Sequence, residues 1–342
     1  MEEIKSRPWR RWVVLVLMIA GFILAGYFVP VRPEITVAPE KLIEAPLFTL
    51  LAPFGPFYLV NTLPTLAFTV LLLIVLAFFT NRSLKKSQET DLVPRGIGNL
   101  MEALLELLYN LTEGSAGPKW AKTIFPWFAT IMIYVLFANL LKLIPGFESI
   151  GLLRPVESGG YAIQSLGNFM GRGWNLLLPT AQTTGGYVLI PFVRGISLDL
   201  NFTFALAIIS VVMIQVIGFQ AQGIGYLSKF FNVRTMFKAP FFGAMDFLVG
   251  LLELISELSK ILSFAFRLFF NMFAGIILVA VVAFLLGKIT IVSSMLYLFE
   301  LFIGIIQAFV FGMLTMVFMA MATQGHVNDE EQPEVRSEAH EI

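Results

Sequence analysis

Long apolar stretches alternate with shorter polar segments along most of the chain. A helix that spans a membrane needs about 20 consecutive, mostly apolar residues. Six stretches meet this requirement, at about residues 13–29, 63–80, 124–144, 200–219, 241–286 and 289–323. The pattern predicts an all-α, polytopic membrane protein with about six transmembrane segments.

The last two apolar stretches are longer than a membrane requires. Residues 241–286 contain no proline. A helix of that length would be about 68 Å long at about 1.5 Å per residue, which is roughly twice the hydrocarbon thickness of a bilayer. The stretch 289–323 follows directly after Gly287 and Lys288. We expect the two stretches to form a hairpin of long helices, tilted by packing against a partner.

Basic residues precede the first apolar stretch, namely Lys5, Arg7, Arg10 and Arg11. A secretion signal begins in the same way, but the small residues that mark a cleavage site do not follow here. We expect residues 1–30 to be an uncleaved membrane anchor, and a removed signal peptide remains the alternative.

The distribution of lysine and arginine predicts the topology. If the N-terminus is cytoplasmic, the inner segments hold most of these residues, as the positive-inside rule requires. We therefore expect a multi-pass protein of a bacterial inner membrane with both termini in the cytoplasm. Residues 31–60 would be extracytoplasmic and 61–325 membrane-embedded, with an outer loop at 146–196 and a polar cytoplasmic tail at 326–342. The amphipathic segment 96–113 would lie on the inner surface.

Composition narrows the possible chemistry. The 342 residues are 57% hydrophobic and only 13% charged, whereas soluble domains carry about 25% charge. The net charge is zero, so nothing indicates binding to nucleic acid. The chain has no cysteine, and its two histidines, His326 and His340, lie in the polar tail. No cofactor or metal site is therefore expected, and ion chemistry within the membrane must use Arg, Lys, Asp, Glu and amide groups.

Polar residues follow one face of the fifth apolar stretch. At about 100° per residue, six of them fall within a stripe about 80° wide on a helix. They are Glu253, Ser256, Lys260, Ser263, Arg267 and Asn271. The rest of this stretch is mostly Leu, Ile, Phe, Ala and Val, so the stripe requires a polar or ionisable counterpart outside the helix.

Arg267 is the central residue of the stripe. An unpaired arginine in the middle of a bilayer costs at least about 2.5–3.5 kcal/mol on insertion scales. An internal carboxylate such as Glu253 or Glu300 would compensate it, but we favour an arginine that faces an ion path or a partner's carboxylate. For Lys260 and Glu253, a solvated entrance or a pair within the helix is equally consistent with the pattern.

The sixth stretch carries a second polar face. Ser293, Glu300 and Gln307 are spaced by seven residues and therefore share one side of the helix. Gly304 and Gly312 would let a neighbouring helix come close. We expect Glu300 to serve ion transfer in the outer half of the membrane, and Gln307 either to serve it or to bond a neighbouring helix.

Polar residues also mark the ends of the third and fourth stretches. Asp199 and Asn201 open the fourth, where they would either cap the helix or contribute to the ion path. Asn139 and Lys142 end the third, and we expect the Lys142 side chain to extend to the interface.

The two polar faces resemble those of one membrane-protein family, the a subunit of F-type ATP synthases. Residues 267–275 read Arg-Leu-Phe-Phe-Asn-Met-Phe-Ala-Gly and are similar to its hallmark Arg-Leu-Phe-Gly-Asn-Met-x-Ala-Gly. Residues 307–311, followed by Leu314 and Thr315, are similar to its last helix. Residues 139–145 and 199–201 match two weaker signatures. The resemblance covers about residues 60–325.

The resemblance implies a function and partners. Such a subunit would provide two half-channels for proton translocation to and from a rotating ring of c subunits, coupling ion flow to ATP synthesis. Arg267 would face the ring carboxylate, and Gln307 would lie beside it. Other partners would be the b subunits of the peripheral stalk and the remaining ATP synthase subunits. The chain would have no catalysis by itself within this H⁺-transporting two-sector ATPase.

The sequence departs from the family pattern at particular positions. Phe270 replaces the small residue of the hallmark. Where the family often pairs two ionisable groups, this chain has Ile276 and Glu300. Glu300 would thus work without an ionisable partner. Two other classes of function remain as alternatives: a secondary transporter with a midplane site at Arg267, and a structural membrane scaffold.

Overall fold

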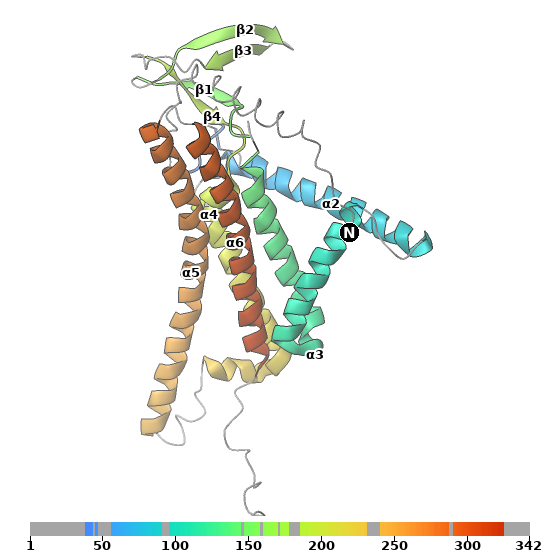
Figure 1. Ribbon diagram of the computed structural model, residues 1–342. Helices are drawn as coiled ribbons and strands as arrows, with labels where there is room; N and C mark the ends of the chain where they lie inside the picture. Colours follow the sequence, from blue (N-terminus) through green and yellow to red (C-terminus); the bar gives the residue numbers. More distant parts are fainter. Residues whose placement is uncertain are drawn as a thin grey trace, which may run out of the picture. The chain divides into compact units, whose positions relative to one another are not determined.

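The computed structural model describes most of the chain (Figure 1). The described residues are 38–43, 45–46, 56–90, 96–144, 147–157, 160–169, 172–177, 185–230, 240–286 and 290–324. The expected anchor, with its apolar stretch at about 13–29, and the tail at 326–342 lie outside them.

Long helices dominate the described residues. They are α2 (Thr62–Thr90), α3 (Ile97–Leu141), α4 (Leu200–Gln222), α5 (Pro240–Leu286) and α6 (Thr290–Thr323). Within this part of the chain, five helices are long and apolar enough to cross a membrane. The prediction of a polytopic helical membrane protein is confirmed.

Helix α3 extends well beyond the predicted third segment. It joins the amphipathic segment 96–113 to the apolar stretch, and it kinks at Gly117, which has φ 74° and ψ 164°. Glycine adopts a positive φ without steric cost. Pro118 follows, and because proline lacks an N–H it favours a new helix start. The amphipathic segment is helical as predicted, while its place on the membrane surface stays a prediction.

Helix α5 is continuous over 47 residues, which corresponds to about 70 Å at 1.5 Å per residue. Helix α6 has 34 residues. No proline lies inside either helix after the first position of α5, so the backbone hydrogen bonds continue without interruption. The two unusually long helices are thus as predicted.

Short strands occupy the segment between α3 and α4, which the sequence pattern indicated only as a loop. Strand β1 (Gly151–Pro155) pairs antiparallel with β4 (Tyr187–Pro191), and β2 (Ile163–Phe169) pairs antiparallel with β3 (Arg172–Leu177). A Cβ atom on Gly151 would lie 1.9 Å from the carbonyl oxygen of Ile190. Glycine is therefore required for this strand pairing. A 3-10 helix, η1 (Ile196–Leu198), then leads into α4.

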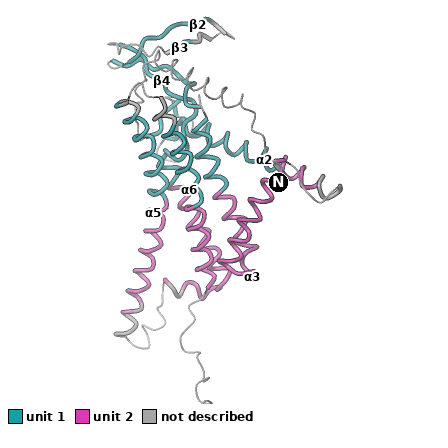
Figure 2. The backbone as a smooth tube through the Cα atoms, viewed as in Figure 1, with its two compact units in different colours: residues 1–78, 133–203, 265–309 teal, residues 79–132, 204–264, 310–342 magenta. Residues whose placement is uncertain are grey.

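The chain divides into two compact units (Figure 2). Unit 1 comprises residues 1–78, 133–203 and 265–309, and unit 2 comprises 79–132, 204–264 and 310–342. Buried polar side chains of unit 1 include Asn139, Ser197, Asp199, Glu300 and Gln307. The core of unit 2 is mainly apolar, with large buried side chains at Leu108, Phe128, Ile214, Phe311 and Met316.

Helices α5 and α6 pack against each other in both units. In unit 2 the Phe264 ring lies 5.4 Å from Phe311 and 5.9 Å from Phe318, measured between centroids. In unit 1 Asn271 bonds to Gln307. Within each unit the contacts move forward along α5 as they move backward along α6. In unit 2, Lys260 is near Phe318 and Phe264 is near Phe311. In unit 1, Asn271 bonds to Gln307 and Gly275 is near Glu300, so the two helices run antiparallel in each unit.

Candidate functional site

Arg267 lies on the exposed face of α5 in unit 1. Its neighbours Leu268 and Phe269 are buried on the opposite side. The exposed face continues along α5 with Phe270, Ala274, Leu278, Val281 and Leu285. Asn271 is exposed on the same face, so Arg267 is the charged side chain of a mostly apolar surface. Among the described residues, no carboxylate pairs with it, so the alternative of an internal counter-charge is not supported.

Phe270, which replaces a small residue of the hallmark motif, is 55% exposed. Its ring contacts Phe266 at 5.4 Å and Phe269 at 5.3 Å between centroids. Because it lies on the exposed face, the large side chain does not displace the interior packing of unit 1.

Asn271 and Gln307 connect α5 to α6 one turn beyond Arg267. The Asn271 Nδ2 atom donates a hydrogen bond to Gln307 Oε1 over 2.6 Å. Gln307 is only 2% exposed. The hydrogen bond between helices that was one interpretation of Gln307 is therefore present, and it fixes this amide beside the arginine-bearing helix.

Glu300 pairs with Lys142, the residue that follows α3. The Nζ–Oε1 distance is 2.5 Å, and the side chains are 4% and 7% exposed for Lys142 and Glu300. The expectation that Lys142 extends to the interface was wrong. A buried counter-charge on α6 holds the ammonium inside instead, since a desolvated charge is tolerated only when it is paired.

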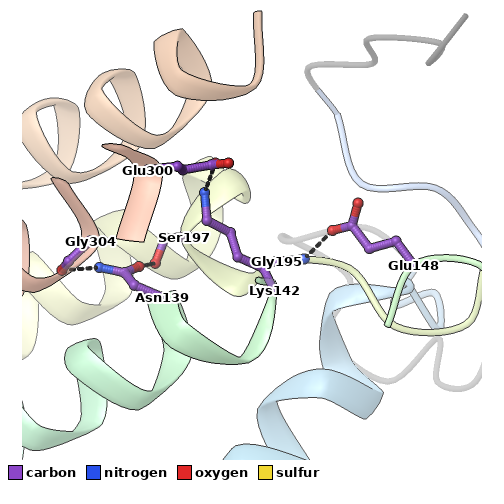
Figure 3. A network of polar contacts seen from close by, with 7 residues as sticks. All are labelled: Asn139, Lys142, Glu148, Gly195, Ser197, Glu300 and Gly304. Carbon is purple, nitrogen blue, oxygen red and sulfur yellow. Dashed lines mark hydrogen bonds and ion pairs between the residues drawn. The ribbon is translucent and has the colours of Figure 1, made fainter. Parts of the chain in front are cut away.

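A second pair of polar contacts lies next to this ion pair (Figure 3). Asn139 Nδ2 donates to the carbonyl oxygen of Gly304 over 3.2 Å, and Ser197 Oγ donates to Asn139 Oδ1 over 2.6 Å. A Cβ atom on Gly304 would lie 3.3 Å from Asn139 Cβ. The glycine thus permits the close approach of α3 and α6 that the sequence suggested.

Glu148 extends the charged cluster beyond Lys142. Its Oε1 atom accepts a hydrogen bond from the backbone N–H of Gly195 over 3.0 Å. Burial lowers the pKa of Lys142, which lies one residue beyond the apolar span, while the charges of Glu300 and Glu148 oppose this change. Two carboxylates therefore act on one buried ammonium group.

Asp199 caps α4, as one interpretation of the sequence predicted. Its Oδ1 atom accepts a hydrogen bond from the backbone N–H of Asn201 over 2.9 Å, which is the geometry of an N-cap. Its Oδ2 atom accepts from Thr62 Oγ1 over 2.8 Å. Asp199 is 5% exposed, whereas Asn201 is exposed. Asp199 therefore joins the first residue of α2 to the start of α4.

The remaining polar residues of the α5 stripe belong to unit 2. Lys260 pairs with Glu257 over 2.9 Å, and its ammonium lies 4.7 Å from the Phe318 ring centroid. Lys260 thus takes part in a pair within the helix, but its partner is Glu257 and not Glu253. Glu253 is half-buried, and Ser256 and Ser263 are exposed. Ser293 belongs to α6, but its side chain lies outside the described part of the chain.

Most of the chain matches one known protein family. The sequence profile described as ATP synthase A chain matches residues 64–320. The chain belongs to the ATP synthase A chain family. Every residue of the candidate site lies within the match. The family resemblance that the Arg267 and Gln307 motifs suggested is thus confirmed.

Curated relatives agree with this assignment to the ATP synthase A chain family. ATP synthase subunit a of Helicobacter pylori strain P12 is 29% identical over 262 residues, which cover 76% of this chain and 91% of the relative. ATP synthase subunit a of Campylobacter jejuni is 30% identical over 263 residues, which cover 75% and 88%. Family membership makes the chain a multi-pass membrane subunit of ATP synthase, with a role in proton transport for ATP synthesis, in association with other ATP synthase subunits.

The sequence interpretation missed the role of two charged residues, one in each unit. Lys142 was assigned to the interface, although it belongs to residues 139–145, whose resemblance to the family marked them as noteworthy. Glu257 lies about 80° from Arg267 on a helical wheel, just outside the polar stripe. Its spacing of three residues from Lys260 was the signal for a pair on one helix.

Proposed function

We propose that the chain provides two half-channels that carry protons to and from a rotating ring of c subunits, and so couples proton flow to ATP synthesis. The b subunits of a peripheral stalk would be further partners. The chain would lie in a bacterial inner membrane with both termini in the cytoplasm and residues 146–196 outside. The family and the arrangement of charged residues on α5 and α6 support this proposal.

The observation that carries the proposal is the surface position of Arg267. Its guanidinium lies on a mostly apolar face of α5, with no ion pair to another described residue. Such a charge would be costly against lipid, and a carboxylate on a neighbouring c subunit would compensate it. Arginine stays protonated in proteins, so Arg267 attracts the ionised carboxylate and does not pass protons directly between the half-channels.

The two half-channels would use different polar clusters. Unit 1 supplies the buried Lys142–Glu300 pair and the Asn139–Ser197 hydrogen bond. Polar groups of unit 2 would form the other half-channel, and these are Glu253, Ser256, Glu257, Lys260 and Ser263. Arg267 follows the unit 2 cluster on α5 and precedes Glu300 of the unit 1 cluster in sequence, and we propose that it separates the two half-channels.

ATP-driven proton pumping in inverted membrane vesicles tests this function. Arg267→Ala should abolish pumping while the complex still assembles. Arg267→Lys should fail as well, because lysine deprotonates more readily when buried and lacks the fixed fork of donors. The exposed Arg82 on α2 offers a matched control, and Arg82→Ala should pump normally. Normal pumping by the Arg267→Ala complex would contradict the proposal.

A further inference from the structure

The Lys142–Glu300 ion pair is buried, charged and formed between residues far apart in the sequence. We infer that Lys142 is a positioning residue for Glu300: its ammonium holds the carboxylate at a fixed place beside the end of α3, and each proton taken up by Glu300 must break this pair. The inference rests on the proposed function, in which Glu300 belongs to a half-channel.

The packing around Lys142 directs its ammonium toward α6. A Cβ atom on Gly195 would lie 3.3 Å from Lys142 Cδ, so the segment before η1 covers the aliphatic stem. The end of the side chain is left to meet Glu300 (Figure 3). The residue replaces, from a different helix, the ionisable partner that the sequence lacks at Ile276.

Lys142 also interacts with two carboxylates, the exposed Glu148 and the buried Glu300. Glu148 is exposed and acts on Lys142 through its charge, whereas Glu300 is buried. The series Glu148, Lys142 and Glu300 thus extends from the surface of unit 1 to its interior.

The polar groups continue along α6 beyond Glu300. Glu300, Gly304 and Gln307 fall on one face of the helix. The Gly304 carbonyl oxygen accepts the Asn139 hydrogen bond, and Gln307 reaches Asn271 on the arginine-bearing helix. All of these contacts lie within unit 1. For a proton released from Glu300, the Gly304 carbonyl oxygen and the Gln307 amide are therefore the next polar groups along α6, and Gln307 bonds to the helix that carries Arg267.

Glu300 takes up a proton and releases it in two steps. A hydrated proton from the aqueous side gives its proton to a carboxylate oxygen of Glu300, an O–H bond forms, and water is released. Glu300 becomes neutral, while Lys142 stays an ammonium facing Glu148 alone. When the proton passes on to the ring carboxylate, Glu300 is again an anion and the ion pair re-forms. Tyr297, which lies within electrostatic reach of Glu300, and the backbone of Gly275 on α5 complete its surroundings.

Proton flow measured over a pH series tests the role of Lys142. The assembled complex in inverted vesicles would carry Lys142→Met, Lys142→Arg or Glu300→Gln, with flow normalised to assembled complex. Lys142→Met removes the ion-pair partner of Glu300, so the pH profile of proton flow should differ from that of the wild type. The maximal flow should fall several-fold because the carboxylate is no longer held in place. Lys142→Arg should keep the wild-type profile, as should Lys122→Met, which removes an exposed lysine from the same helix.

The neutral double variant Lys142→Met with Glu300→Gln keeps the test decisive. It should assemble even if Lys142→Met alone does not, because no unpaired buried charge remains, and it should flow no worse than Glu300→Gln. An unchanged pH profile in an assembled Lys142→Met complex, or failure of the double variant to assemble, would overturn the inference. Arg267→Ala in the same vesicles separates the two ideas, since normal pumping there would refute the proposed function itself.

Discussion

The Asn271 amide donates a hydrogen bond to the Gln307 carbonyl oxygen and thereby ties α5 to α6 beside Arg267. The acceptor residue is buried, while the donor belongs to the exposed stripe that contains the arginine. The bond therefore connects the interior of unit 1 with the surface proposed to face the c-subunit ring.

This bond predicts that substitutions at the two amides are coupled. Asn271→Leu should lower proton pumping several-fold, because it leaves the buried Gln307 oxygen without a donor at a cost of about 1–3 kcal/mol. Gln307→Leu should have a similar effect, and the double variant should be little worse than either single one. Pumping rates per assembled complex measure this. Asn201→Leu, at an exposed amide on α4, serves as the control, and multiplicative losses in the double variant would contradict the coupling.

The close packing of α6 in unit 2 predicts a loss of stability at one glycine. A Cβ atom on Gly312 would lie 2.8 Å from Met132 Cβ, whereas a Cβ atom on Gly114 would meet nothing within 4 Å. Gly312→Ala should therefore destabilise the protein by about 1–3 kcal/mol through overpacking. Thermal unfolding in detergent should show a lower midpoint for Gly312→Ala and no loss for Gly114→Ala. Equal midpoints for the two variants would show that α3 and α6 are not in such close contact.

The cap at Asp199 predicts a structural effect that can be separated from proton transfer. Asp199→Ala removes the acceptor for the Asn201 N–H and for the Thr62 hydroxyl, so it should lower the stability by about 1 kcal/mol or more. Asp199→Asn keeps an oxygen acceptor and should retain most of the stability and normal pumping. Unfolding midpoints and pumping rates measured together decide between the two roles. If the Asp199→Asn protein is stable but does not pump, Asp199 takes part in proton transfer.

The topology can be tested with cysteines, because the natural chain has none. Ser149 precedes β1 and Ser115 lies near the kink of α3, and both are exposed. On intact cells, Ser149→Cys should react with a membrane-impermeant thiol reagent and Ser115→Cys should not. Both should react after the membrane is opened. The reverse pattern on intact cells would contradict cytoplasmic termini.

The sequence predicted the described helices well because length and apolarity alone determine which segments can cross a bilayer. The absence of proline between residues 241 and 286 likewise predicted the unbroken α5. The strands between α3 and α4 were missed, since their short runs are interrupted by glycine and proline and show little alternation. The kink at Gly117 lies between the amphipathic segment 96–113 and the third apolar stretch, which the sequence pattern separated.

The candidate site was predicted in part. Arg267 and Asn271 on α5 and Glu300 and Gln307 on α6 stood out because a helical wheel depends only on sequence spacing. The Lys142–Glu300 pair did not, because it joins residues separated by 158 positions. No local pattern reveals such a contact, and only the packing of α3 against α6 brings the two charges together.

The same separation has a consequence for biogenesis. Ribosomes add about 5–20 residues per second, so the nascent chain holds Lys142 for roughly 8–30 s before Glu300 is made. During that interval, the flexible stem of Lys142 lets its ammonium stay in the interfacial water. The ion pair can therefore form only after α6 has been made. A truncated product that ends before α6 would lack the partner carboxylate of Lys142.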